Sequence, residues 1–207
     1  NPKQSFAEEQ HVLYRQFVKE EKFDEAFVHW KKAYDIAPAA DGQRSFHYSD
    51  GIDIYRHKFK NETDEAKKKE YVAEILKLYD ELVACYPKEA NDYLGLKVFD
   101  MFYTLRSPYS QLQAAADQAI EMGGNKTSYT VFMPYATLVT YNFQNEKMDA
   151  ETARQVYTKL NEIADYNVEN NEELGAYYQQ AREAMNGEFA KIENEILIPQ
   201  VEQFEKQ

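Results

Sequence analysis

The chain has 207 residues, which is enough for one large domain or two small ones. Its 36 acidic and 24 basic residues give a net charge of -12, which argues against the phosphate-binding surface that nucleic acids require. We therefore expect no nucleic-acid partner. Glycine and proline are few, at 7 and 6 residues, whereas tyrosine and phenylalanine are abundant, at 17 and 12. This composition favours long helices packed through aromatic rings and disfavours an all-β fold.

The single cysteine, Cys85, cannot form a disulfide within the chain. It lies in a strongly helical run, so we expect a small buried residue there. The sequence contains no run of about 18 or more apolar residues, so it predicts no transmembrane segment. The chain begins at Asn1, which suits both a mature form that has lost a signal peptide and a shortened chain.

Apolar residues recur with the 3.6-residue period of amphipathic helices along most of the chain, and turn signals interrupt them at intervals. The pattern predicts an all-α protein of about ten helices, paired into about five helical hairpins that form one domain. The hairpins are expected over residues 5–40, 43–87, 89–124, 128–166 and 171–206.

Turn and capping signals delimit the first two hairpins. The first is expected to break near Lys22 and to stop at Pro38, because proline cannot continue a helix. In the second, Asp64 is expected to cap a helix that Pro87 ends. The buried stripe predicted for that helix is Tyr71, Ile75, Leu78, Tyr79, Leu82 and Val83.

Similar signals divide the rest of the chain. Ser107-Pro108 predicts a helix with proline at its first position, and Gly123-Gly124 predicts the end of that helix. Asp149 is expected to cap a helix of the fourth hairpin. Residues 167–171 are predicted to form a polar loop, and Asn186-Gly187 to separate the last two helices.

Two patterns repeat between hairpins. A small residue recurs in the first helices, at Gly51, Gly95, Ala136 and Gly175. Glycine inside a helix costs about 0.5–1 kcal/mol relative to alanine, so its recurrence indicates close helix crossings. Triplets of apolar residues with a constant spacing recur in the second helices: Ala26, Trp30 and Ala33; Ile75, Tyr79 and Leu82; Leu112, Ala116 and Ala119; Ala153, Tyr157 and Leu160.

At these residues the chain resembles the tetratricopeptide repeat family, whose unit has about 34 residues. Tyr14 takes the family's usual small position, and Gln10 replaces its tryptophan. Later units keep Leu94-Gly95 and Leu174-Gly175 but need insertions between their helices. Tyr48–Gly51, Lys67–Lys69 and residues 157–167 also resemble divergent tetratricopeptide proteins that bacteria export. The first hairpin fits the family pattern at Leu13, Phe17, Ala26, Trp30, Ala33 and Pro38.

The resemblance implies a right-handed superhelical solenoid whose first helices line a concave groove for a protein or peptide segment. The groove positions of the first two units become His11, Arg15, Val18, Lys19, Tyr48, Ile52, Tyr55 and Arg56. Those of the third and fourth become Asp92, Leu96, Phe99, Asp100, Met133, Thr137, Thr140 and Tyr141. We expect Arg15, Lys19 and Arg56 to meet an acidic segment. Rings are expected to supply contact area at Tyr48, Tyr55 and Tyr141.

Alternatives remain for these residues. Arg15 and Lys19 also suit an exposed, solvated helix face, and most tyrosines suit core packing. Asp50 and Asp53 are interpreted as helix caps or surface acids. The four histidines lack the spacing of metal ligands, and no phosphate-binding or catalytic motif occurs, so we expect neither a metal nor a cofactor.

The sequence therefore predicts a non-enzymatic scaffold that binds a protein or peptide. The alternative is a carbohydrate- or small-ligand-binding protein of the bacterial envelope, whose groove aromatics stack on sugar rings. An enzyme on a helical scaffold is a third hypothesis. The resemblance favours export to the periplasm or the periphery of the outer membrane, with a cytoplasmic location left open. The oligomeric state is also left open.

Overall fold

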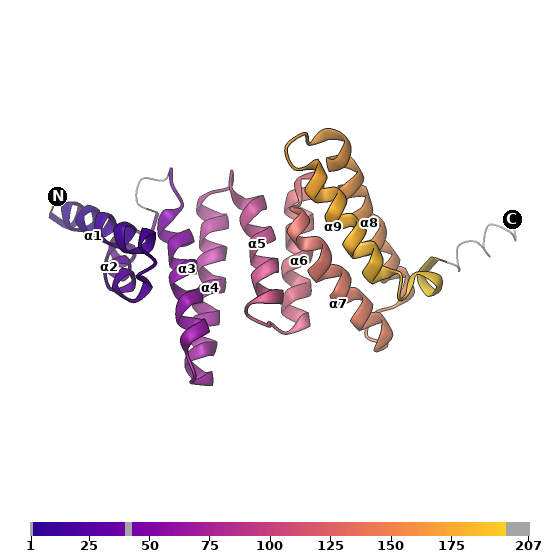
Figure 1. Cartoon of the computed structure of the whole chain (residues 1–207), viewed down its shortest axis with the longest axis horizontal. Helices are drawn as coiled ribbons and strands as arrows, with labels where there is room; N and C mark the ends of the chain where they lie inside the picture. Colours follow the sequence, from indigo (N-terminus) through magenta and orange to yellow (C-terminus); the bar gives the residue numbers. More distant parts are fainter. Residues whose placement is uncertain (1, 40–42, 198–207) are drawn as a thin grey trace, which may run out of the picture. The chain divides into compact units, whose positions relative to one another are not determined.

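The structure is a computed structural model that describes residues 2–39 and 43–197. Its described residues form helices and connecting turns without any strand, which confirms the all-α prediction. The chain divides into two compact units, Asn1–Tyr93 (unit 1) and Leu94–Gln207 (unit 2). Figure 1 labels the helices in chain order.

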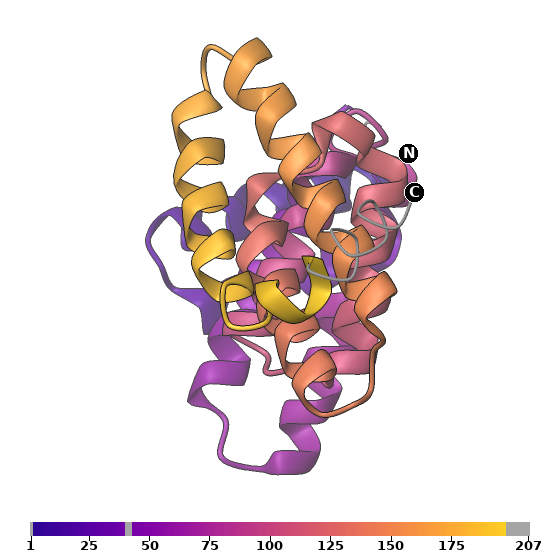
Figure 2. The same ribbon diagram turned by 90° about the vertical axis from the view of Figure 1, so that its right-hand side faces the viewer.

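Unit 1 contains the two helical hairpins that the sequence predicts. Its helices are α1 (Pro2–Lys19), α2 (Phe23–Ile36), α3 (Phe46–Asn61) and α4 (Glu65–Cys85). α1 packs against α2, and α3 packs against α4, as Figures 1 and 2 show for the second pair. The two hairpins join because α2 also packs against α3.

Local signals set the ends of these helices. Glu21, between α1 and α2, has a φ of 56°, a left-handed conformation typical of a helix end. The Asp64 carboxylate accepts hydrogen bonds from the backbone N–H groups of Ala66 and Lys67, which confirms the predicted cap. Tyr71 is half-buried, and the other members of the predicted stripe of α4 are buried: Ile75, Leu78, Tyr79, Leu82 and Val83.

The core of unit 1 centres on Trp30, whose side chain is 1% exposed. Its ring stacks on Tyr34, with centroids 5.0 Å apart, and meets the edge of Tyr55 at 5.6 Å. Gly51 of α3 lies so close that an added Cβ would be 2.5 Å from Cζ2 of Trp30. The predicted close helix crossing is therefore confirmed between α2 and α3.

Unit 2 holds most of α5 (Ala90–Tyr103) and the later helices. These are α6 (Tyr109–Gly123), α7 (Phe132–Gln144), α8 (Ala150–Asn170) and α9 (Gly175–Phe189). Short 3₁₀ helices, η1 (Gly124–Lys126) and η2 (Tyr129–Val131), connect α6 to α7. α7 packs against α8 and α9, and α8 packs beside α9, as seen in Figure 2.

Two predicted signals of unit 2 are confirmed. Gly124 follows α6 with a φ of 52°, and its backbone N–H donates to the carbonyl of Ile120. The Asp149 carboxylate accepts a hydrogen bond from the backbone N–H of Thr152 at 2.7 Å, which caps α8. The start predicted for α6 is wrong by one residue. Pro108 was expected to be the first helical residue, but it directly precedes the helix, with a ψ of 140°, and α6 begins at Tyr109.

The predicted loop over residues 167–171 is wrong, because α8 continues to Asn170. Asn167 is buried, and its side-chain amide donates to the carbonyls of Asn125 at 2.7 Å and Ile163 at 2.8 Å. A polar residue that satisfies its hydrogen bonds inside the fold does not need a solvent-exposed loop. The partner at Asn125 is distant in sequence, so local composition gives no sign of it.

The predicted break at Asn186-Gly187 is also wrong, since α9 runs through both residues. The side-chain amides of Asn186 and Asn161 exchange two hydrogen bonds, at 3.0 and 3.2 Å, between α9 and α8. These bonds favour the helical conformation there. The helix predicted over residues 188–204 lies partly outside the described residues.

Cys85 is exposed, which corrects the prediction of a buried residue. It is the last residue of α4, next to the buried Tyr86 that follows the helix. Its sulfur still lies 3.6 Å from the hydroxyl oxygen of the buried Tyr48, so one side of Cys85 contacts the fold.

Gly51→Ala tests the close crossing in unit 1. The added methyl group would overlap the Trp30 ring, so we expect a loss of about 1–3 kcal/mol in the free energy of unfolding. Gly187→Ala is the matched control, because Gly187 is exposed within α9 and an added Cβ would meet nothing within 4 Å. The control should gain about 0.5–1 kcal/mol. Equal effects in urea unfolding would contradict the close crossing.

Candidate functional site

The candidate site is a hollow of about 640 Å³ in unit 1, which we call the N-terminal hollow. It lies where α1 passes the end of α2 and the start of α3. Its lining is mixed, with apolar side chains beside groups of both charges. The lining residues are Lys3, Gln4, Ala7, Glu8, His11, Val12, Ile36, Ala37, Arg44, Phe46 and His47.

The helical period explains how α1 builds one wall of the hollow. Gln4, Glu8 and His11 follow each other at positions i, i+4 and i+7, which share one helix face. Ile36 is the last residue of α2, and Phe46 is the first of α3. The opposite wall is therefore made where the chain leaves one helix and enters the next.

Two histidines meet at the inner side of the hollow. Nδ1 of His11 lies 2.9 Å from Nε2 of His47. His47 is buried, and its Nδ1 lies 2.8 Å from the carbonyl oxygen of Ala37. Because a carbonyl only accepts, Nδ1 of His47 carries a hydrogen. The Trp30 indole N–H also donates to the backbone carbonyl of His47 at 2.6 Å.

One helical turn along α1, Arg15 forms an ion pair with Asp50 of α3. Nη1 of Arg15 donates to both carboxylate oxygens, at 2.7 and 2.6 Å. The guanidinium carbon lies 3.9 Å from the centroid of the Phe46 ring, a cation–π arrangement. The Asp50 side chain is 8% exposed and that of Arg15 is 24% exposed, so the pair is shielded from water on one side.

Burial and charge act in opposite directions on Asp50. Burial raises the pKa of its carboxyl, and the hydrogen bond and positive charge of Arg15 oppose that rise. Burial also raises the pKa of the neighbouring Tyr14 hydroxyl, and the negative charge of Asp50 adds to this effect. Arg15 therefore favours the ionised form of Asp50 against the effect of burial, and the Tyr14 hydroxyl and the charge of His47 act in the same direction.

The predicted groove residues of α3 are corrected by their burial. Tyr48, Ile52 and Tyr55 are all buried, because α3 packs against α2 on one side and α4 on the other. Their side chains belong to the core of unit 1 and are not exposed for contact with a partner. Arg56 donates to Asp53 on its own helix at 2.8 Å.

The remaining predicted site residues have separate positions. His11 lines the N-terminal hollow, whereas Arg15 lies beside it in the pair with Asp50. Lys19 is exposed at the end of α1. Tyr141 is exposed in unit 2, where its ring contacts that of Tyr109 at 5.1 Å.

Asp50 and His47 are the residues whose roles the sequence did not reveal. Asp50 is buried in α3 and is not the cap or surface acid that we expected. A signal for the histidine contact was present: His11 and His47 are 36 residues apart, close to the length of one repeat of about 34 residues. Equivalent positions in successive hairpins are expected to be neighbours.

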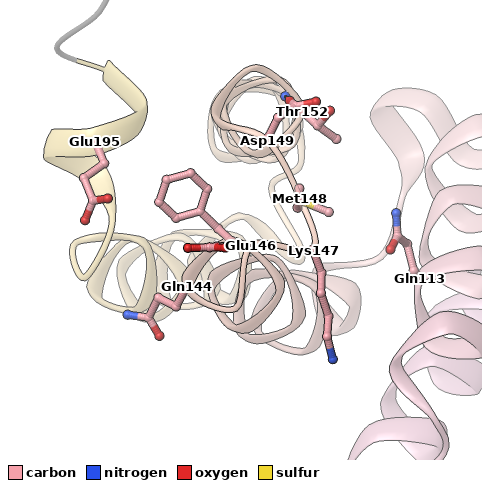
Figure 3. A pocket seen from close by; sticks show the side chains of 9 residues that line it. Gln113, Gln144, Glu146, Lys147, Met148, Asp149, Thr152 and Glu195 are labelled. Carbon is pink, nitrogen blue, oxygen red and sulfur yellow. The ribbon is translucent and has the colours of Figure 1, made fainter.

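Unit 2 has a second hollow, of about 780 Å³, at the α7–α8 connection. Figure 3 shows its side chains, with Lys147 extending away from Asp149 and Thr152. Asp149 already caps α8, and the lining is mostly polar. It is the weaker candidate because it offers few apolar groups. The lining comprises Gln113, Phe143, Gln144, Glu146, Lys147, Met148, Asp149, Thr152 and Glu195.

Among the residues that the structure describes, no group of three or more His, Cys, Asp or Glu side chains is placed to hold a metal ion. Within the same residues, no helix is both long and apolar enough to cross a bilayer. Comparison with protein-family models, with curated proteins and with solved structures gave no match to this chain. The resemblance to tetratricopeptide repeats therefore rests on the sequence pattern.

Arg15→Met tests the ion pair. It leaves the buried carboxylate of Asp50 without its cation, so we expect a loss of about 2–3 kcal/mol in the free energy of unfolding at pH 7. Without Arg15 the folded-state pKa of Asp50 rises further. As the pH falls, the folded variant then binds a proton at Asp50 before the unfolded variant does. Its loss in the free energy of unfolding, relative to the parent, should therefore become smaller as the pH falls through the raised pKa toward the ordinary value of 3.8.

The control is Lys68→Met, which removes an exposed i, i+3 pair with Glu65. Its expected effect is about 0–0.5 kcal/mol at both pH values. Urea unfolding at pH 7.0 and at pH 4.5, which is nearer the ordinary pKa of 3.8, compares the two variants. A deficit in Arg15→Met that is small, or that does not change with pH, would contradict the role of the pair.

Proposed function

We propose that the chain is a non-enzymatic scaffold that binds a protein or peptide segment, with the N-terminal hollow as its binding surface. The exposure of apolar side chains at the hollow carries the proposal. Val12 is 66% exposed and Ile36 is 41% exposed, although both lie next to a concave surface. Covering such side chains with an apolar group of a partner is favourable.

The charges around the hollow favour an acidic segment. Lys3 and Arg44 contribute two positive charges, against one negative charge at Glu8. Among the lining residues basic side chains thus outnumber acidic ones, in a protein whose net charge is -12. An acidic segment would be attracted to this place and repelled by most of the remaining surface.

The chemistry of the occupant follows from these two features. A large apolar side chain would contact Val12, Ile36 and Phe46, and an adjacent carboxylate would approach Lys3 or Arg44. The resemblance to tetratricopeptide repeats supports peptide binding, and the solenoid arrangement belongs to the same proposal. The likeness to exported bacterial members favours the cell envelope as the compartment in which binding occurs.

A second candidate is carbohydrate binding at α5. Leu96, Phe99 and Tyr103 are each about 40% exposed and lie at i, i+3 and i+7, on one helix face. The centroids of the Phe99 and Tyr103 rings lie 4.6 Å apart and their planes are tilted by 45°, so a sugar ring would stack on one ring and contact the other. A glycan array probed with the parent protein and with Phe99→Ala tests this candidate, which predicts binding that the variant loses.

Val12→Asp tests the N-terminal hollow with a matched control. A phage-displayed library of random peptides is first selected on the parent protein. We expect the enriched peptides to combine a large apolar residue with Asp or Glu. Val12→Asp should weaken their binding at least about tenfold, because it places a carboxylate where the apolar side chain docks.

The control is Val28→Asp, which changes another exposed valine of unit 1, 51% exposed, that does not line the hollow. Its affinity should stay within about twofold of the parent. Fluorescence polarisation with a labelled selected peptide measures both. The proposal fails if no peptide is enriched, or if the two substitutions weaken binding equally.

A further inference from the structure

Two tyrosine rings stack on each other in unit 2, beside the turn that joins α8 to α9. The ring centroids of Tyr129 in η2 and Tyr177 in α9 lie 5.6 Å apart, and the ring planes are inclined by only 14°. One face of each ring is therefore covered by the other ring. Tyr177 is nevertheless 53% exposed, so the outer face of its ring is open to solvent. We call this pair of rings the tyrosine platform.

Contacts within unit 2 hold the platform in place. The Tyr178 hydroxyl donates to the carbonyl of Thr127 at 2.8 Å, and the Tyr178 ring meets that of Tyr129 edge-on at 5.4 Å. At the end of α8, the side-chain amide of Asn167 donates to the carbonyl of Asn125 at 2.7 Å. The segment of η1 and η2 is thus fastened to both helices. The platform therefore exists before a ligand binds, which lowers the entropic cost of binding.

A carboxylate shares the helix face of the exposed ring. The backbone N–H of Gly175 donates to the carbonyl of Asn171 at 2.8 Å, so the first helical turn includes Glu173. Glu173 therefore precedes Tyr177 by four residues on one helix face, and Gln180 follows it by three. Both side chains are exposed and both accept hydrogen bonds. The ring of Tyr177 is thus followed and preceded along α9 by hydrogen-bond acceptors.

Negative charge predominates around the platform. Glu169 lies near the end of α8 and Glu172 lies in the turn, and both are exposed, as is Glu173. None of the three pairs with a base among the residues that the structure describes. Lys126 of η1 supplies one positive charge against them. In residues 94–207 acidic side chains are nearly twice as numerous as basic ones, so unit 2 attracts a basic partner.

We propose that the tyrosine platform binds an arginine side chain of a basic protein segment. The planar guanidinium lies flat on the outer face of the Tyr177 ring and donates hydrogen bonds to the carboxylate of Glu173. Glu169 and Glu172 attract the other basic side chains of the segment. This surface goes beyond the proposed function, because it lies in unit 2 and selects the opposite charge from the N-terminal hollow.

Fluorescence polarisation tests the platform with a labelled peptide of alternating Arg and Gly, in about 0.15 M salt. Tyr177→Ala should weaken binding at least about threefold, because it removes the stacking surface without changing the charge. Tyr177→Phe keeps the ring and should bind within about 1.5-fold of the parent. Tyr141→Ala is the matched control, since it removes another exposed tyrosine of unit 2 that contacts a second ring. It should also stay within about 1.5-fold.

Two charge variants separate local binding from general attraction to an acidic protein. Glu173→Gln should weaken binding about two- to fivefold, because it removes the carboxylate beside the ring. Glu151→Gln removes an exposed carboxylate at the other end of α8. It should change the affinity less than about 1.5-fold, because salt screens charges at that distance. A peptide with citrulline, which is uncharged, in place of Arg should not bind measurably.

The proposal is overturned if the Arg peptide does not bind the parent, or if the two tyrosine-to-alanine variants weaken binding equally. Equal effects of Glu173→Gln and Glu151→Gln also overturn it. Carboxylates at a helix start stabilise the helix through its dipole, so a loss of stability in Glu173→Gln without a loss of binding leaves Glu173 only that role. If Tyr177→Ala does not fold, backbone amide shifts of the parent decide. Shifts on peptide addition should gather at residues 125–130 and 168–180, and shifts only elsewhere refute the platform.

Discussion

Burial of Trp30 is the constraint on which the rest of unit 1 depends. The indole ring takes the space between α2 and α3, which is available only because residue 51 has no side chain. Its N–H must find an acceptor in that enclosed place, and it uses the backbone carbonyl of His47. A single large side chain thus fixes both the distance between two helices and the start of α3.

The position of the candidate site follows from that packing. Once the backbone of His47 is held by Trp30 and its Nδ1 by Ala37, one edge of the imidazole remains, and it faces His11 of α1. The pair of Arg15 with Asp50 connects the same two helices one turn further on. α1 is therefore joined to α3 by two ionisable contacts, and both lie beside the hollow.

The sequence predicted what depends on neighbouring residues and missed what depends on distant ones. The caps at Asp64 and Asp149 and the helix end at Gly124 were predicted, because each acts within one turn of its own position. The continuity of α8 and α9 was missed, because Asn167 and Asn186 find their partners on other segments. The groove positions at Tyr48, Ile52 and Tyr55 were misassigned for the same reason, since packing of α3 on both sides decides their exposure.

The distribution of histidine confines a response near neutral pH to unit 1. All four histidines of the chain lie between His11 and His57, and histidine is the side chain whose ordinary pKa falls near 6.5. In unit 2 buried contacts at the loops use neutral groups, as where the Tyr178 hydroxyl donates to the carbonyl of Thr127 and Asn167 donates to Asn125. Such contacts keep their strength when the pH changes between 5 and 8. A proton that a histidine takes up in that range is therefore taken up in unit 1, where His11 and His47 lie at the hollow and His29 and His57 lie apart from it.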